Sequence, residues 1–220
     1  YKRIMIYDKD IREPLFDLLE VKYGKTRILE EKQIGSARAD AVMITESDIY
    51  GIEIKSDADT YARLSRQVAY YDMYYDYNYV VVGSSHGNHI TEHVPNHWGI
   101  ITVEELEDES LDFYFLREPK LNPNMDWYKK IEILWRFELA HIQELNELPA
   151  YKNKSKKTVG EMIVDRVPHD VLREQVCMEL FERDYDTIAE RINAYREANG
   201  KKARRRRRYK RRRKKKDVSQ

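Results

Sequence analysis

The segment Tyr-Gly-Ile-Glu-Ile-Lys-Ser at residues 50–56 alternates apolar and charged side chains. In a β-strand, successive side chains point to opposite faces, so Ile52 and Ile54 can enter a core while Glu53 and Lys55 emerge together on the other face. The pattern therefore predicts a strand that places a carboxylate beside an ammonium group.

A second carboxylate precedes this strand. Asp40 lies in the run of residues 39–44, and the polar residues 45–48 separate that run from the strand of Glu53. Such spacing is typical of a hairpin, which would bring Asp40 beside Glu53. Mg²⁺ takes oxygen ligands, commonly one or two carboxylates with water and substrate phosphate. The patch therefore predicts a magnesium site of a phosphodiesterase, with Lys55 orienting the attacking water or stabilising negative charge.

A half-buried strand also presents Glu and Lys to solvent without any catalytic role, which is the alternative interpretation. The context favours a site. An amphipathic pattern over residues 10–22 predicts a helix before the hairpin, a second helical pattern follows it, and residues 79–83 then form an apolar strand pattern.

This order of helix, strand, strand with Asp, strand with Glu-X-Lys, helix with Gln and strand resembles the PD-(D/E)XK nuclease superfamily, which has the restriction-endonuclease-like fold. The chain looks like the resolvase-like and uncharacterised bacterial or phage branch. The resemblance covers about residues 10–105, and it departs from the family name because Arg38-Ala39-Asp40 stands where Pro-Asp would.

The resemblance implies a set of site residues. Asp40, Glu53 and the carbonyl of Ile54 would ligate Mg²⁺, with Mn²⁺ able to substitute, and Lys55 would be the catalytic lysine.

Two further residues are matched by the resemblance. Resolvase-like members often have a metal-associated Glu in the first helix, where this chain has Glu13; the alternative is a capping box that Glu13 forms with Asp10 at the helix start. The superfamily often has a Gln or other polar residue near the lysine, where this chain has Gln67. Gln67 lies on the flank of an apolar stripe that includes Tyr71 and Tyr75, so the alternative is an ordinary boundary residue.

The composition is that of a protein with a real core and no membrane span. The chain has 220 residues and one cysteine, Cys177, which excludes an intramolecular disulfide and favours a reducing compartment. No apolar run approaches about 18 residues and no secretory signal is visible. We therefore expect a cytoplasmic protein, of a bacterium or phage-infected cell, with no membrane partner.

Charge divides the chain sharply. Residues 201–216 contain 14 of the 40 Lys and Arg and no acid, so residues 1–200 carry 26 basic and 38 acidic side chains, a net charge of −12. The basic segment has too few apolar residues to fold, so a disordered arm that contacts nucleic acid is expected. The predicted contacts include Arg204, Arg205, Arg206, Arg207 and Arg208. The expected partner is DNA, with RNA as an alternative.

These features predict an α/β fold, with a restriction-endonuclease-like core of a mixed sheet flanked by helices, then a small all-α domain and a disordered basic tail. The predicted divisions are a nuclease-like domain at 1–118, a linker at 119–124, a helical domain at 125–199 and the tail at 200–220. Two prolines in the linker region interrupt regular pairing.

The helical domain has a weaker resemblance to a SAP-type helix-extended-loop-helix DNA-binding motif. The predicted nucleic-acid contacts are Lys152, Lys154, Lys156 and Lys157. The alternative is a lysine-bearing loop that joins two helices of an accessory bundle.

The combined expectation is a Mg²⁺-dependent endonuclease-like phosphodiesterase that hydrolyses DNA in repair, recombination, phage replication or defence. The alternative is a non-catalytic nucleic-acid-binding or protein-interaction module on a nuclease fold, since a fold by itself does not establish an activity.

Overall fold

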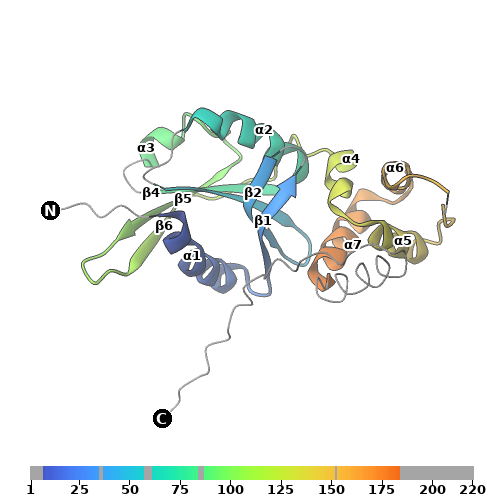
Figure 1. The fold of residues 1–220 in the computed structure, drawn as a ribbon, viewed down its shortest axis with the longest axis horizontal. Coiled ribbons are helices and arrows are strands. Elements are labelled where there is room, and N and C mark those ends of the chain that lie inside the picture. Colours follow the sequence, from blue (N-terminus) through green and yellow to red (C-terminus); the bar gives the residue numbers. More distant parts are fainter. Residues whose placement is uncertain (1–6, 35–36, 57–60, 84–86, 152, 184–220) are drawn as a thin grey trace, which may run out of the picture. The chain divides into compact units, whose positions relative to one another are not determined.

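The computed structural model describes residues 7–34, 37–56, 61–83, 87–151 and 153–183. Its elements follow one another along the chain as shown in Figure 1. They are α1 (Asp8–Tyr23), β1 (Arg27–Ile34), β2 (Ala37–Ile44), β3 (Ile49–Lys55), the 3₁₀ turn η1 (Tyr61–Arg63), α2 (Leu64–Tyr74), β4 (Tyr77–Gly83), α3 (Gly87–Ile90), β5 (Gly99–Glu105), β6 (Leu111–Arg117), α4 (Trp127–Lys130), η3 (Ile131–Ile133), α5 (Arg136–Leu145), α6 (Lys156–Arg166) and α7 (His169–Glu182).

The six strands form one mixed sheet in which spatial order equals chain order. β1, β2 and β3 are joined by antiparallel hairpins, β3, β4 and β5 run parallel, and β6 returns antiparallel to β5. The helix α2 makes the crossover between β3 and β4, as parallel strands require. This confirms the predicted α/β class with a mixed sheet flanked by helices.

Helices cover the two faces of the sheet (Figure 1). α1 packs on one face, where its Ile11 and Leu15 share a core with Ile52 and Ile54. α2 packs on the other face. The two isoleucines of β3 therefore enter a core as predicted, but β3 is covered on both sides, so the opposite face, which carries Glu53, is buried rather than exposed. Glu53 is 1% accessible because α2 lies over it.

α1 begins two residues earlier than the sequence pattern suggested, with Tyr7 as its N-cap. Asp10 and Glu13 are therefore inside the helix, and the capping box considered for this pair is not formed at its start. Pro14 lies in the middle of α1, at an exposed position.

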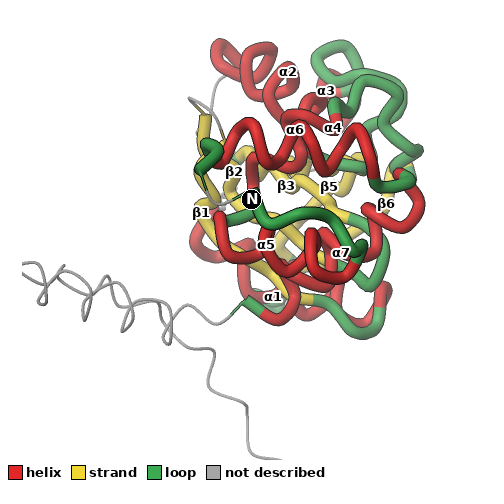
Figure 2. Tube along the Cα trace, turned by 90° about the vertical axis from the view of Figure 1, so that its right-hand side faces the viewer, coloured by secondary structure: helices red, strands yellow, loops and turns green. Residues whose placement is uncertain are grey.

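The helical segment that follows β6 shares the core of the α2 face. Ile131, Leu139, Ile163 and Leu172 belong to the same buried cluster as Tyr71 of α2. The described residues up to Phe181 accordingly form one compact unit, and the predicted linker at 119–124 lies within it. Figure 1 shows the helices α4 to α7 gathered at one end of the sheet, and in Figure 2, turned by 90°, they lie in front of the strands.

Buried polar contacts hold this segment against the end of α2. The Nζ of Lys130 lies 2.7 Å from both carboxylate oxygens of Asp76, and the two side chains are 0% and 2% exposed. Asp76 also accepts a hydrogen bond from the backbone N–H of Ile49 at 2.9 Å. Asn122 donates to the carbonyls of Asp72 and Tyr75, both at 2.8 Å. A buried cation is therefore paired across 54 residues of sequence.

Candidate active site

The site lies where β2 and β3 separate. Their antiparallel ladder runs from the Ile44–Ile49 pair to the Ala41–Ile52 pair. Beyond it, the Asp40 carboxylate joins the strands, since its Oδ2 accepts a hydrogen bond from the backbone N–H of Ile54 at 2.9 Å. The hairpin predicted from the sequence is formed, and Asp40 is brought beside the strand of Glu53.

Glu53, Lys55 and Gln67 form a closed set of polar contacts. Lys55 Nζ lies 2.7 Å from Oε1 of Glu53 and donates to Oε1 of Gln67 at 3.0 Å. The side-chain amide of Gln67 donates in turn to Oε1 of Glu53. The structure thus places Gln67, from α2, against the lysine and the glutamate that the sequence analysis singled out.

Tyr71, on α2, contacts both strands through its hydroxyl. Its hydroxyl lies 2.7 Å from Oε2 of Glu53, to which it donates, 3.1 Å from the carbonyl of Ile52 and 3.3 Å from the backbone N–H of Asp40. Burial, followed by the charge of Glu53, raises the pKa of Tyr71 well above its ordinary value, so the hydroxyl keeps its proton. Sequence reasoning assigned Tyr71 to packing alone; its spacing of four residues from Gln67, on one helix face, was the available signal.

Gly51 permits this arrangement. A Cβ at residue 51 would overlap the rings of Tyr71 and Tyr75. The glycine in β3 therefore lets α2 approach the sheet closely enough for the Tyr71 hydroxyl to reach the backbone of both strands.

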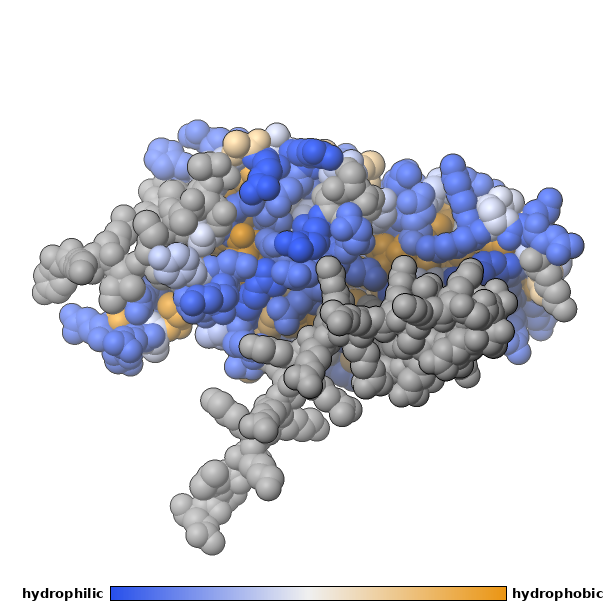
Figure 3. All heavy atoms as spheres, viewed as in Figure 1, coloured by the Kyte–Doolittle hydropathy of each residue, from blue (hydrophilic) through white to orange (hydrophobic). Residues whose placement is uncertain are grey.

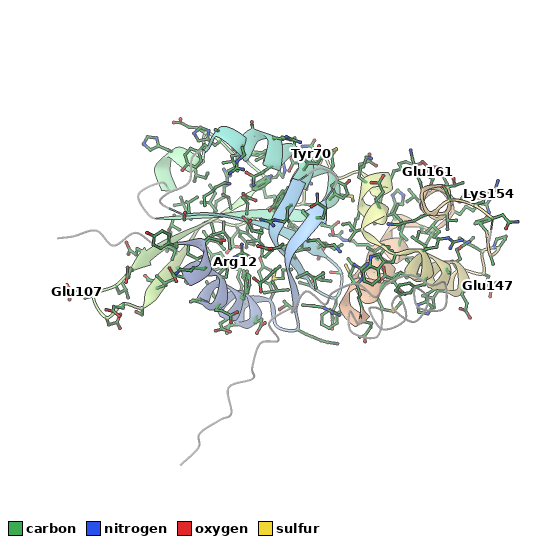
Figure 4. The ribbon with its side chains drawn as sticks, in the orientation of Figure 1. Arg12, Tyr70, Glu107, Glu147, Lys154 and Glu161 are labelled. Carbon is green, nitrogen blue, oxygen red and sulfur yellow. The ribbon has the colours of Figure 1, made fainter. Side chains whose placement is uncertain are left out.

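Arg12 is a second residue that the sequence reasoning missed. It lies on α1 and donates to the carbonyl of Asp40 at 3.3 Å, while its Nη2 is 3.9 Å from Oδ1 of the same residue. Arg12 also pairs with Asp8 at 2.7 Å and with Glu30 at 3.2 Å. Figure 4 shows Arg12 between α1 and the sheet. Glu13, the residue predicted for a metal role, is exposed; the α1 residue that the structure brings to Asp40 is Arg12.

Asp40 has an unusual electrostatic environment. Its side chain is 21% exposed, and burial together with the charge of Glu53 raises its pKa to about 7. Two carboxylates that share a site disfavour each other's ionised state, and a cation placed between them relieves this repulsion. Lys55 at Glu53 and Arg12 at Asp40 supply part of that compensation.

Asp40 and Glu53 are the side chains of this site that could hold a hard divalent cation. Asp40 and Glu53 offer carboxylate oxygens, and Mg²⁺ commonly uses one or two carboxylates with waters completing its octahedral shell. Within the described part of the chain, no cluster of three or more His, Cys, Asp or Glu side chains is arranged to hold a metal ion. The ligand role of the Ile54 carbonyl stays a prediction.

The raised pKa of Asp40 predicts that stability falls with pH in metal-free protein. Between about pH 4 and pH 7 the folded state holds a proton that the unfolded state has released, so the free energy of unfolding decreases as pH rises, by at most about 4 kcal/mol. Asp40→Asn should remove this dependence and exceed the wild type in stability at pH 8. Urea unfolding with EDTA at pH 5 and pH 8 measures both; Asp112→Asn, an isosteric change at an exposed position on β6, is the control. If the free energy of unfolding falls equally between pH 5 and pH 8 in the wild type and in Asp40→Asn, the pH dependence does not come from Asp40.

Tyr71→Phe should cost about 1–3 kcal/mol of stability, because a buried oxygen of Glu53 loses its donor. Tyr75→Phe is a matched control in the same aromatic cluster, since within the described residues the Tyr75 hydroxyl has no hydrogen-bond partner. This second change should be neutral or slightly stabilising. Equal destabilisation of the two variants in urea unfolding would show that the Tyr71 hydroxyl contributes only packing.

The predicted lysine contacts lie elsewhere in the unit. Lys154 is exposed in the connection between α5 and α6, and Lys156 and Lys157 are exposed in the first turn of α6. Both the predicted DNA-binding motif and its alternative, a lysine-bearing loop between two helices of a bundle, contain two helices joined in this way, so the DNA contacts of these lysines stay a prediction. Lys152 and the tail arginines Arg204, Arg205, Arg206, Arg207 and Arg208 lie outside the described residues.

The fold and the site define a mixed α/β protein whose central strands carry a buried carboxylate–lysine cluster. The profile of the family described as Bacteriophage P4 protein cII matches residues 6–206, and the chain belongs to this family. No curated protein and no solved structure matches the chain. Among the described helices, none has the length and apolar character needed to cross a membrane.

Proposed function

We propose that this protein is a Mg²⁺-dependent endonuclease-like phosphodiesterase that hydrolyses DNA. The observation that carries the proposal is the convergence of Asp40, Glu53 and Lys55, with Gln67, at the point where β2 and β3 separate. Membership of a phage protein family favours phage replication or defence as the setting, with repair and recombination as alternatives.

Each residue has a distinct role in this proposal. Asp40 and Glu53 would hold Mg²⁺ through their carboxylate oxygens. When bound, the ion supplies a water of lowered pKa and neutralises charge on the phosphodiester. Lys55 Nζ donates hydrogen bonds, so it can orient the attacking oxygen or stabilise the charge that develops on the phosphate. Gln67 keeps Lys55 in place through its own Oε1.

Burial of the site also strengthens the electrostatic interactions of its charged side chains. Glu53 and Lys55 side chains are only 1% and 11% exposed. Partial burial lowers the local dielectric, so the attraction between a lysine and a developing anion is greater than in water. Arg12 at Asp40 and Tyr71 at Glu53 fix the two carboxylates before any ligand is bound.

A second function is supported by a specific observation. Both carboxylate oxygens of Glu53 are already bonded, Oε1 by Lys55 and Gln67 and Oε2 by Tyr71. Because these side chains already satisfy one another's hydrogen bonds, they can serve as a structural element of a non-catalytic nucleic-acid-binding module. In that case the lysines near α6 and the basic tail would bind the nucleic acid. Substitution of Lys55 would then leave DNA binding intact, and there would be no cleavage activity to lose.

The direct test incubates the purified full-length protein with labelled single-stranded, duplex and branched DNA, and with RNA. Each substrate is treated with Mg²⁺, Mn²⁺ or EDTA. The proposal expects cleavage of DNA with either metal and none with EDTA. Binding without cleavage of any of these substrates would favour the non-catalytic module.

A further inference from the structure

The exposed face of α2 begins beside the candidate site. Arg63 and Arg66 are exposed, and Gln67, which holds Lys55, directly follows Arg66. Between residues 61 and 74 the one acidic side chain is Asp72, which is buried. The outer side of this helix is therefore cationic where it meets the site.

The same face continues to α6 through one shared residue. Arg66 lies 5.8 Å from the ring of Tyr70, which Figure 4 labels on α2. One turn further, the Tyr74 hydroxyl donates to Oε2 of Glu132 at 3.3 Å. The Nζ of Lys129 donates to the other carboxylate oxygen at 3.1 Å, and Lys156 donates to the carbonyl of Glu132 at 2.8 Å. α2, α4 with η3, and the start of α6 are thus connected at Glu132.

The resulting surface, called the α2–α6 surface, is rich in cations. It comprises Arg63, Arg66, Tyr70, Lys129, Lys156 and Lys157. Figures 1 and 2 both place α2, α4 and α6 toward one side of the described unit, and hydrophilic side chains predominate along that side in Figure 3. Residues 1–200 carry a net charge of −12, so a polyanion is repelled by the average surface and is drawn to a local cationic one.

We propose that the phosphate backbone of DNA binds along the α2–α6 surface and that this surface leads it to Lys55 and Gln67. The inference rests on the proposed function only for cleavage at the site of Lys55 and Gln67. Binding of DNA along the surface is independent of cleavage. α2 has 11 residues and spans about 16 Å, a length that corresponds to roughly five phosphates of one strand. In the absence of DNA, the Nζ of Lys129 lies 3.1 Å from Oε1 of Glu132, and the Nζ of Lys157 lies 3.8 Å from Oε1 of Glu161.

The test compares two triple variants of the full-length protein with the same change in net charge. One carries Arg66→Gln, Lys129→Gln and Lys156→Gln on the α2–α6 surface. The control carries Lys9→Gln, Lys22→Gln and Lys25→Gln, which lie on or just after α1 at the other face of the sheet. Binding of labelled single-stranded and duplex DNA is measured in EDTA across a range of KCl concentrations, so that no cleavage occurs.

The surface variant should bind DNA more weakly and should flatten the slope of log affinity against log salt by roughly 2–3, because each phosphate contact contributes about 0.9 on duplex and about 0.7 on single-stranded DNA. The control should keep the wild-type slope. Equal slopes for the two triple variants would overturn the inference, as would a wild type that binds neither form. A wild type that binds through this surface but never cleaves would instead overturn the proposed function alone.

Discussion

Lys55→Met should reduce DNA cleavage by on the order of 10²–10³ or more, because the site loses the ammonium group proposed to donate to the attacking oxygen or the phosphate. The lysine is held at 2.7 Å from Glu53 and at 3.0 Å from Gln67, so no other ammonium group takes its place among these contacts. Initial rates of cleavage with Mg²⁺ and with Mn²⁺ measure the effect.

Removing Lys55 also leaves the buried Glu53 without its cation, so folding has to be controlled. Lys55→Arg keeps a positive charge beside Glu53 but replaces a compact ammonium by a planar guanidinium of different reach. It should remain folded in thermal unfolding and still lose most of the activity. Wild-type cleavage by a folded Lys55→Arg and a folded Lys55→Met would rule out the catalytic role of the lysine.

Lys130→Met should destabilise the protein by about 3–5 kcal/mol, since the buried Asp76 carboxylate would lose its cationic partner. The neighbouring Lys129 offers a matched control. Its side chain is 41% exposed and pairs with Glu132, whose side chain is 37% exposed, so Lys129→Met should cost less than about 1 kcal/mol. Urea unfolding of the two variants side by side measures the difference.

The Lys130–Asp76 pair also predicts that residues 1–119 do not fold on their own. Truncation removes Lys130, Asn122 and the helices that cover the core of the α2 face. A fragment with a cooperative unfolding transition, together with equal stability of Lys129→Met and Lys130→Met, would contradict this dependence of the sheet on the helical segment.

Much of the site was predictable because it depends on local pattern. Alternation in β3 assigns Ile52 and Ile54 to one face and Glu53 with Lys55 to the other, and the short polar stretch after residue 44 requires a hairpin that brings Asp40 close. The helical stripe predicted that Tyr71 and Tyr75 pack on the sheet, and both are buried.

The remainder depends on contacts between distant residues, which a local pattern does not encode. Glu53 is buried because α2, more than ten residues later, covers its face. Arg12 reaches Asp40 across 28 residues, and Lys130 reaches Asp76 across 54. Helical periodicity in the segment from residue 125 onward predicted helices, but it could not show that they share a core with the sheet.

Calorimetric titration with Mn²⁺ measures whether Asp40 and Glu53 together hold a metal ion, as proposed for the nuclease site. The wild type and Asp112→Asn should both bind Mn²⁺ at one site, whereas Asp40→Asn, which keeps an oxygen able to accept the hydrogen bond from Ile54, should lose that binding. Mn²⁺ binding of equal strength in Asp40→Asn and in the wild type would show that Asp40 is not a metal ligand.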